Sequence, residues 1–270
     1  MKKLSTILIA LLLLLSAEGQ ILRYSNYTAP APPEPETELR GPDELWDGHS
    51  VVWLEHDTLL TESGGAVSAW TDIVNGYTLL PYASDGSAGT SDNYPSWIAE
   101  NGVVFDGVND VLKYMVSGWT TFGTVYAVVK QVSWTNADVL FAYAGTGSVR
   151  VAQRTTGEGS SPNVHAASST GYSLAITNLP LDTWGLITLE PITDSTDIII
   201  QLNDNTAITY DDTNLGSYTS AGVILGATHA AAPALQRYGN VAIKAIIFRD
   251  QIDDSATRAA IKAYLTEKYL

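Results

Sequence analysis

The 270-residue sequence contains no cysteine. This absence excludes disulfide bonds, thiolate metal sites, a cysteine nucleophile and a lipid-anchoring cysteine. Basic residues are also scarce, because 14 lysines and arginines stand against 29 aspartates and glutamates, and the formal net charge is -15. A chain this acidic is a poor partner for nucleic acid or for an anionic membrane surface.

Motifs for nucleophiles and cofactors are missing as well. The four histidines are scattered without an HExxH pattern, so no zinc site is expected. No serine has a GxSxG context, and the stretch "GTGSVR" (145–150) lacks the strand–helix setting of a dinucleotide-binding loop. The sequence therefore predicts no cofactor, with calcium as the one open question.

The N-terminus has the pattern of a signal peptide. Two lysines precede the apolar run 4–15, and "AEG" then places small residues where a signal peptidase reads them. The run is shorter than the ~20 residues that a membrane span needs. We expect residues 1–19 to be removed before Gln20, with no membrane span in the mature chain. The predicted location is extracellular or at the cell surface, or on a virion if a phage encodes the chain.

Composition changes twice further along the chain. Residues 20–44 are rich in proline and acidic residues, which indicates an extended, solvated linker. From residue 45 onward, about a dozen short β-rich runs alternate with turn residues, as in a sandwich or jelly roll. In one of these runs, Val125, Ala127 and Val129 share a face. We expect a single all-β domain over residues 45–270.

The C-terminal stretch "DDSATRAAIKAYLTEKYL" differs from the rest. Asp254 suits an N-cap, and Ile261, Tyr264 and Leu265 recur at helical spacing. Lys268 extends this stripe, with a stem that can cover apolar surface. The pattern predicts one helix of about four turns docked on the sandwich.

Four stretches, in order, resemble the concanavalin A-like, laminin-G-like lectin/glucanase superfamily. They are "VVWLEHDT…SGGAVSAWTDIVNG", "YPSWIAENGVVFDGVNDVL", "LDTWGLITLEPITDSTDIIIQLNDNTAI" and "GNVAIKAIIFRDQIDDSATRAAIKAYLTEKYL", and they cover nearly all of residues 45–270. The resemblance implies a two-sheet antiparallel jelly-roll β-sandwich with one C-terminal α-helix. It does not imply catalysis, because members include lectins, hydrolases, adhesion modules and virion domains.

The stretch "WLEHDTLLTES" raises the possibility of an active strand. Laminarinase-like members of the superfamily carry Glu-x-Asp-x-x-Glu on one strand. Here Glu55 and Asp57 supply the first two positions, but Leu60 occupies the third, and Glu62 lies two residues too far along. The stretch also falls at the family's opening strand, upstream of the catalytic one. We therefore interpret it as a surface-facing acidic pair at a strand exit.

Other polar residues offer a weak metal site. Asp106, Asn109 and Asp110 in "FDGVNDVL" carry oxygens that suit Ca²⁺. The same residue types are ordinary turn chemistry, and the resemblance favours a structural hairpin. The acidic stretch "YDDTN" (210–214) has the same two readings.

Aromatic residues suggest contacts with carbohydrate, since sugar rings stack on aromatic faces. Trp53, Trp70 and Trp184 lie within strand patterns and are expected in the core. Trp97, Trp119 and Trp134 lie near loops and are candidates for exposure. The predicted ligand-binding set is Trp97, Trp134, Asn163, His165, Arg237 and Tyr238, with His229 nearby in the sequence.

From these patterns we expect a secreted, non-catalytic domain that binds a glycan or cell-surface polymer. The alternative is a structural decoration domain of a virion or cell surface, with another protein as its partner. A third class is a glycoside hydrolase or polysaccharide lyase whose site the sequence does not reveal.

Overall fold

The computed structural model describes residue 45 and residues 47–115, 123–144, 149–153, 163–167, 175–191, 198–210, 222–231 and 234–270. The predicted signal peptide and linker, Trp119 and residues 211–214 lie outside these ranges.

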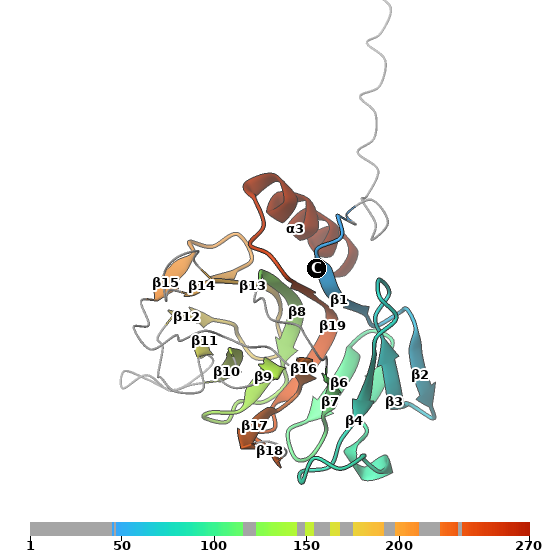
Figure 1. Ribbon diagram of the computed structural model, residues 1–270. Helices are drawn as coiled ribbons and strands as arrows, with labels where there is room; N and C mark the ends of the chain where they lie inside the picture. The colour runs from blue at the N-terminus through green and yellow to red at the C-terminus, as the bar shows by residue number, and fades with distance from the viewer. Residues whose placement is uncertain are drawn as a thin grey trace, which may run out of the picture. The chain divides into compact units, whose positions relative to one another are not determined.

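Antiparallel strands dominate the described chain and form two layers (Figure 1). Sheet A runs in the spatial order β2-β3-β5-β6-β19-β8-β13-β14-β15. The strand β1 pairs with the same edge of β19 as β6 does, further along β19. Its strands are β1 (Ser50–Glu55), β2 (Leu60–Ser63), β3 (Ala66–Thr71), β5 (Ser96–Ile98), β6 (Gly102–Asp106), β8 (Val125–Gln131), β13 (Trp184–Pro191), β14 (Ile198–Leu202), β15 (Ile208–Tyr210) and β19 (Asn240–Arg249).

Sheet B runs in the order β4-β7-β16-β9-β10-β11-β12, and β4 also pairs with β3, which links the two layers. Its strands are β4 (Thr78–Pro81), β7 (Leu112–Met115), β9 (Val139–Ala144), β10 (Arg150–Gln153), β11 (Asn163–Ala167), β12 (Ala175–Asn178) and β16 (Gly222–Leu225). A separate hairpin consists of β17 (Thr228–Ala231) and β18 (Ala234–Gln236), and one 3-10 turn spans Ser91–Asn93.

The main core lies between the sheets. Alternate residues of β6 and β19 in sheet A, such as Phe105 and Ile243, pack in one cluster with Leu112, Phe141 and Val223 of sheet B. Strand alternation produces this arrangement, because every second side chain points into the sandwich. The predicted all-β sandwich with one C-terminal helix is therefore confirmed.

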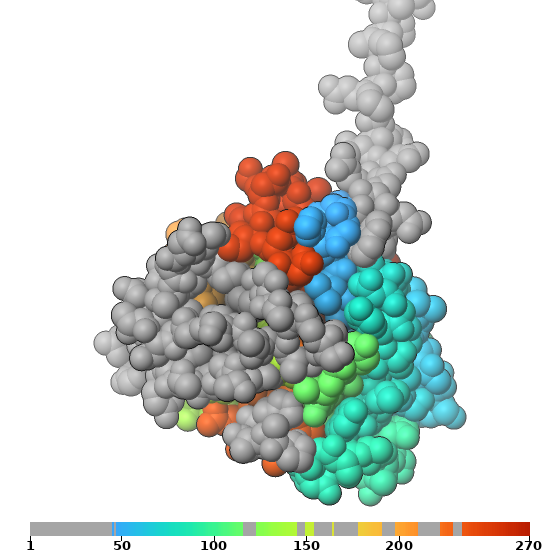
Figure 2. Space-filling view, in the orientation of Figure 1, coloured from blue at the N-terminus to red at the C-terminus, as the bar shows by residue number. Residues whose placement is uncertain are grey.

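The helix α3 (Ser255–Tyr269) covers the outer face of sheet A beside β8 and β13 (Figure 1). Asp254 caps it as predicted, since its carboxylate accepts the N–H of Thr257 at 2.7 Å. Ile261 and Leu265 are fully buried in a second cluster with Val128 of β8. In the space-filling view, α3 and the start of β1 form adjoining surface (Figure 2). No helix among the described residues is long and apolar enough to cross a bilayer.

Two of the three tryptophans expected in the core are there. Trp53 and Trp70 are fully buried. Trp184 is only partly buried, on the outer face of sheet A, where the ammonium groups of Lys130 and Lys244 lie over its ring. Its strand pattern is correct, but the prediction of a core position is wrong, because Trp184 only packs against the margin of the cluster beneath α3 and stays partly exposed.

Candidate functional site

Most of the residues predicted to bind a ligand come together at one end of the sandwich, which we call the loop end. It comprises residues 106–110, 132–138 and 237–240, together with Gln153 and Asn163. Backbone hydrogen bonds connect these segments: Val132 N–H donates to Asn240 at 3.0 Å, and Gln153 N–H donates to Asp138 at 2.7 Å. The pairing of Asn240 with Asp106 joins the first segment to the third.

Residues 237–240 carry the chain from one sheet to the other. Tyr238 bridges to Val139 of sheet B, and Asn240 begins β19 in sheet A. Gly239 between them approaches the backbone closely, because a Cβ at this position would lie 2.4 Å from the carbonyl oxygen of Val139. Any residue larger than glycine would therefore clash at position 239, where the chain passes from sheet B to sheet A.

Backbone strain marks the same region. Arg237 and Ala137 adopt left-handed conformations with φ of 58° and 78°, although neither is glycine. Residues with a Cβ occupy this region at a free-energy cost of roughly 1–3 kcal/mol, and such strain is concentrated at functional sites. No sequence pattern indicates a left-handed conformation at these two positions.

Two carboxyl groups share the turn between β6 and β7. Asp106 Oδ1 accepts the N–H groups of Val108, Asn109 and Asp110 at 2.8, 3.2 and 3.4 Å, and Asp110 Oδ2 accepts the N–H of Asp106 at 3.0 Å. Asp110 is 6% exposed, whereas Asp106 is exposed. Burial, together with the charge of Asp106, raises the pKa of Asp110 to about 7. One carboxyl therefore holds a proton near neutral pH beside a second that faces solvent.

This geometry does not fit calcium. A carboxylate oxygen that already accepts three N–H groups is poorly placed to bind a metal ion. Among the described residues, no group of three or more His, Asp or Glu side chains is placed to hold a metal ion. Asp106, Asn109 and Asp110 lie in one turn that these hydrogen bonds hold together.

A buried pair of amides supports the neighbouring loop. Gln153 Nε2 donates to Gln131 Oε1 at 2.8 Å and to the carbonyl of Ser133 at 2.6 Å, while its Oε1 accepts the N–H of Thr135 at 2.9 Å. Both glutamines are at most 1% exposed. They fix the backbone on either side of Trp134, and no sequence motif pointed to them.

The side chains that this loop presents include an aromatic ring and a carboxyl. Trp134 is partly exposed. Burial raises the pKa of nearby Asp138, partly offset by a hydrogen bond from Thr135. Tyr238 packs against the small apolar cluster around Ile224, and its buried hydroxyl has no hydrogen-bond partner among the described residues.

The strand β11 places the remaining predicted residues relative to this group. Asn163 begins β11 opposite Asn178, and His165 pairs with Ala152, which in turn pairs with Val139. Tyr238 and His165 therefore lie in one row across sheet B, three strand spacings or about 14 Å apart. His229 lies on β17.

Trp97 lies elsewhere. It is in β5, where it is half-buried against the main core, and its indole N–H donates to the carbonyl of His56 at 3.1 Å. A ring held in this way is part of the packing. The structure therefore separates Trp97 from the other predicted ligand-binding residues.

The acidic pair at the exit of β1 is also not at the loop end. Glu55 is 2% exposed beneath α3, where it accepts hydrogen bonds from Lys268 Nζ at 2.6 Å, Tyr264 OH at 2.7 Å and Trp53 Nε1 at 3.0 Å. The prediction that both carboxylates face the surface is wrong for Glu55. Only Asp57, with 47% of its side chain exposed, faces solvent. Two of these contacts, from Lys268 and Tyr264, anchor the helix, and the third comes from Trp53 of the same strand.

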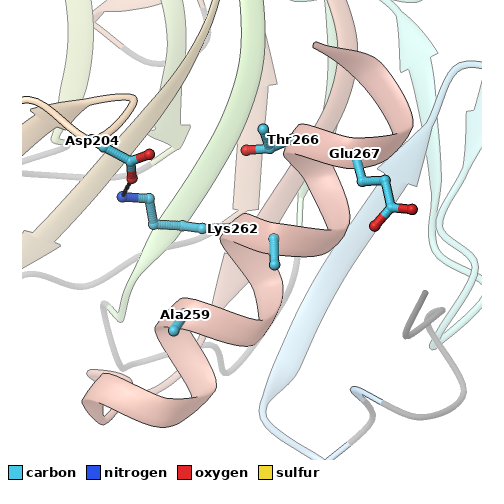
Figure 3. A pocket seen from close by; sticks show the side chains of 6 residues that line it. Asp204, Ala259, Lys262, Thr266 and Glu267 are labelled. Carbon is cyan, nitrogen blue, oxygen red and sulfur yellow. Dashed lines mark hydrogen bonds and ion pairs between the residues drawn. The ribbon is translucent and has the colours of Figure 1, made fainter. Parts of the chain in front are cut away.

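A shallow hollow of about 400 Å³ lies along the other side of α3, between Ala259, Thr266 and Glu267 of the helix and the turn at Asp204 (Figure 3). Lys262 Nζ donates to Asp204 Oδ1 at 2.8 Å across it, and Glu267 points away from that pair (Figure 3). The acidic groups do not converge on a common point. The hollow is therefore a weaker candidate for chemistry than the loop end.

The sequence matches no protein-family model and no curated protein. Solved structures do share its fold. An arabinofuranosidase complexed with arabinofuranosyl-α-1,2-xylobiose aligns over 76% of this chain and 51% of its own, with 14% identity and a TM-score of 0.56. A GH54 α-L-arabinofuranosidase mutant soaked with 4-nitrophenyl α-L-arabinofuranoside aligns over 76% and 52%, with 13% identity and a TM-score of 0.54.

A mutant of Trypanosoma rangeli sialidase that displays trans-sialidase activity aligns over 83% of this chain and 34% of its own, with 11% identity and a TM-score of 0.53. The chain thus spans about half the length of the arabinofuranosidases and a third of the sialidase.

These comparisons correct the prediction of function. The sequence favoured a non-catalytic lectin-like module or a decoration domain, whereas the proteins found to share the fold are an arabinofuranosidase and a sialidase. The conclusion that the domain is not an enzyme is overturned by this finding.

Proposed function

We propose that this chain hydrolyses a glycosidic bond at its loop end. The observation that carries the proposal is the pair of carboxyl groups in one turn, Asp106 and Asp110, with the pKa of Asp110 raised to about 7. Glycosidases use two carboxyl groups, one protonated and one ionised, on either side of the bond that is cleaved. The fold shared with an arabinofuranosidase supports the choice of reaction.

The two carboxyl groups take different roles in this proposal. Asp110 donates its proton to the leaving oxygen of the sugar, because burial keeps it protonated near neutral pH. Asp106 uses Oδ1 to hold the turn, and its Oδ2 makes no hydrogen bond with the described residues. That oxygen is available as the nucleophile or as the base that activates water.

The surrounding side chains suit a sugar. Trp134 is partly exposed, and sugar rings stack on aromatic faces. Arg237, also at the loop end, is exposed. The buried amides of Gln131 and Gln153 hold the Trp134 loop in place.

The test is hydrolysis of aryl glycosides by the purified chain, with 4-nitrophenyl α-L-arabinofuranoside and an aryl sialoside as first substrates. We expect Asp110→Asn to reduce kcat/KM by at least about 100-fold, in the range typical for loss of a general acid. Asp85→Asn is the matched control, because Asp85 Oδ1 also accepts a backbone N–H in an exposed turn, from Ser87 at 2.8 Å. Loss of activity in the control as well, or an unaffected Asp110→Asn variant, would contradict the assignment.

We also infer that the chain is a divergent concanavalin A-like protein and that it is exported. The two-layer sandwich, the Phe-Asp-Gly turn and the closing strand with its helix support the first inference. The basic and apolar N-terminal residues support the second. An extracellular enzyme would meet polymeric glycans directly.

A further inference from the structure

Two lysines on the outer face of sheet A have no acidic partner among the described residues. Lys130 lies on β8 and Lys244 on β19, and neither forms an ion pair there. By contrast, Lys262 and Lys268 of the neighbouring helix are each paired with carboxylates. In a chain with a net charge of -15, a pair of lysines without a carboxylate is unexpected.

The two ammonium groups converge on one ring. Lys130 Nζ lies 5.1 Å and Lys244 Nζ 4.6 Å from the centroid of Trp184, and all three side chains are partly buried. Lys130 and Trp184 are paired across neighbouring strands, whereas a bulge in β19 adjusts the position of Lys244. Burial and the positive charge of Lys130 lower the pKa of Lys244, which shows that the two charges interact.

The hydrogen-bond acceptors of these two lysines are neutral, and some N–H donors of each ammonium group are left without an acceptor among the described residues. Lys130 Nζ donates to Asn101 Oδ1 at 2.9 Å, and Lys244 Nζ donates to the carbonyl of Tyr269 at 3.3 Å. An ammonium group has three donors, so each lysine keeps two. The indole N–H of Trp184 makes no hydrogen bond with the described residues. The result is a group of donors with two positive charges that no carboxylate of the described residues pairs with.

We propose that Lys130, Lys244 and Trp184 form a binding site for the carboxylate or sulfate group of an acidic polysaccharide. An oxyanion there would accept hydrogen bonds from both ammonium groups and would relieve their mutual repulsion. The site adjoins the loop end, because Lys130 directly precedes Gln131, whose amide supports the Trp134 loop. The polysaccharide nature of the ligand rests on the proposed function, and the site itself rests on the lysines and the ring.

Binding measured by affinity electrophoresis and calorimetry tests this proposal. The probes are polygalacturonate for carboxylate, dextran sulfate for sulfate and dextran as the neutral polymer. At about 0.15 M salt the Debye length is about 8 Å, so distant acidic residues are screened and close contacts persist. We expect binding of at least one acidic polymer, no binding of dextran, and about tenfold weaker binding after Lys130→Gln with Lys244→Gln.

The controls separate a site from general charge effects. Lys262→Gln removes one positive charge from the same side of the molecule and should leave binding unchanged, and Lys130→Arg with Lys244→Arg should retain it. The readout is binding and not turnover, so a failure of the proposed hydrolysis does not affect this result. Equal binding of dextran, or equal losses for Lys262→Gln and the double glutamine variant, would overturn the proposal, as would no binding of either acidic polymer.

Discussion

At the loop end, the protonation state of a single residue, Asp110, affects both the proposed chemistry and the stability of the fold. Its pKa is raised from the ordinary value of 3.8 to about 7, first by burial and then by the charge of Asp106. The folded protein therefore binds a proton there that the unfolded chain releases. The stability contributed by this group is fully present below about pH 4 and is lost as the pH rises through 7.

The first prediction follows from this loss of stability with rising pH. Between pH 5 and pH 8.5, the wild-type free energy of unfolding should fall by roughly 2–3 kcal/mol relative to that of Asp110→Asn, because one pKa unit corresponds to about 1.36 kcal/mol. Urea denaturation of both proteins at both pH values measures this difference. Parallel pH dependence of the two proteins would show that Asp110 ionises normally.

Glu55 leads to a second prediction at this scale. Its carboxylate anchors Lys268, Tyr264 and Trp53, so Glu55→Ala should destabilise the fold by about 3–5 kcal/mol, as expected when a buried partner loses its counter-charge. Asp57→Asn is the control and should change stability by less than about 1 kcal/mol, since Asp57 is half-exposed. Thermal melts of the two variants measure the contrast. Equal effects would mean that Glu55 does not hold the helix.

Among the elements, α3 is the one whose structure the sequence predicts most completely. Its cap, its length and its buried stripe follow from local spacing, and the structure confirms all three. The strand alternation in β8 and the burial of Trp53 and Trp70 were equally local signals. The contact between Lys268 and Glu55 joins residues 213 positions apart, and no local pattern encodes it.

In the candidate site, too, local sequence patterns predict some features, whereas others depend on contacts between distant parts of the chain. The Asx turn at Asp106 was expected from its residue types. The amide pair of Gln131 and Gln153 and the strained conformation of Arg237 depend on how the two sheets meet, so no local sequence pattern predicts them. The wrong prediction of a core position for Trp184 has a similar cause. A strand pattern predicts which face of the sheet a residue occupies, but not how completely other elements cover it there.

A third prediction concerns the docking of α3. Ile261→Asp should destabilise the domain by several kcal/mol, on the order of 3–5, because it places an unpaired charge in a fully buried apolar position. Ala259→Asp is the matched control on the exposed face of the same helix and should have a small effect. Chemical denaturation of both variants provides the comparison. Similar stability would show that the helix does not pack on sheet A in solution.

At the scale of the whole molecule, the proposals of export and of catalysis are linked, because an extracellular glycosidase would have to leave the cell to reach its polymer. The fourth prediction is that the mature protein begins at Gln20. N-terminal sequencing or intact-mass measurement of the exported chain tests this directly. A mature product that retains Lys2 and Lys3 would contradict the proposed signal peptide.

The pH dependence of glycoside hydrolysis tests the central claim most directly. If Asp110 is the proton donor, kcat/KM should fall as the pH rises through about 7, because the protonated form is then lost. The Asp110→Asn variant should lack both the activity and this alkaline limb. No turnover of any glycoside by the wild-type chain, or a profile that Asp110→Asn leaves unchanged, would contradict the account.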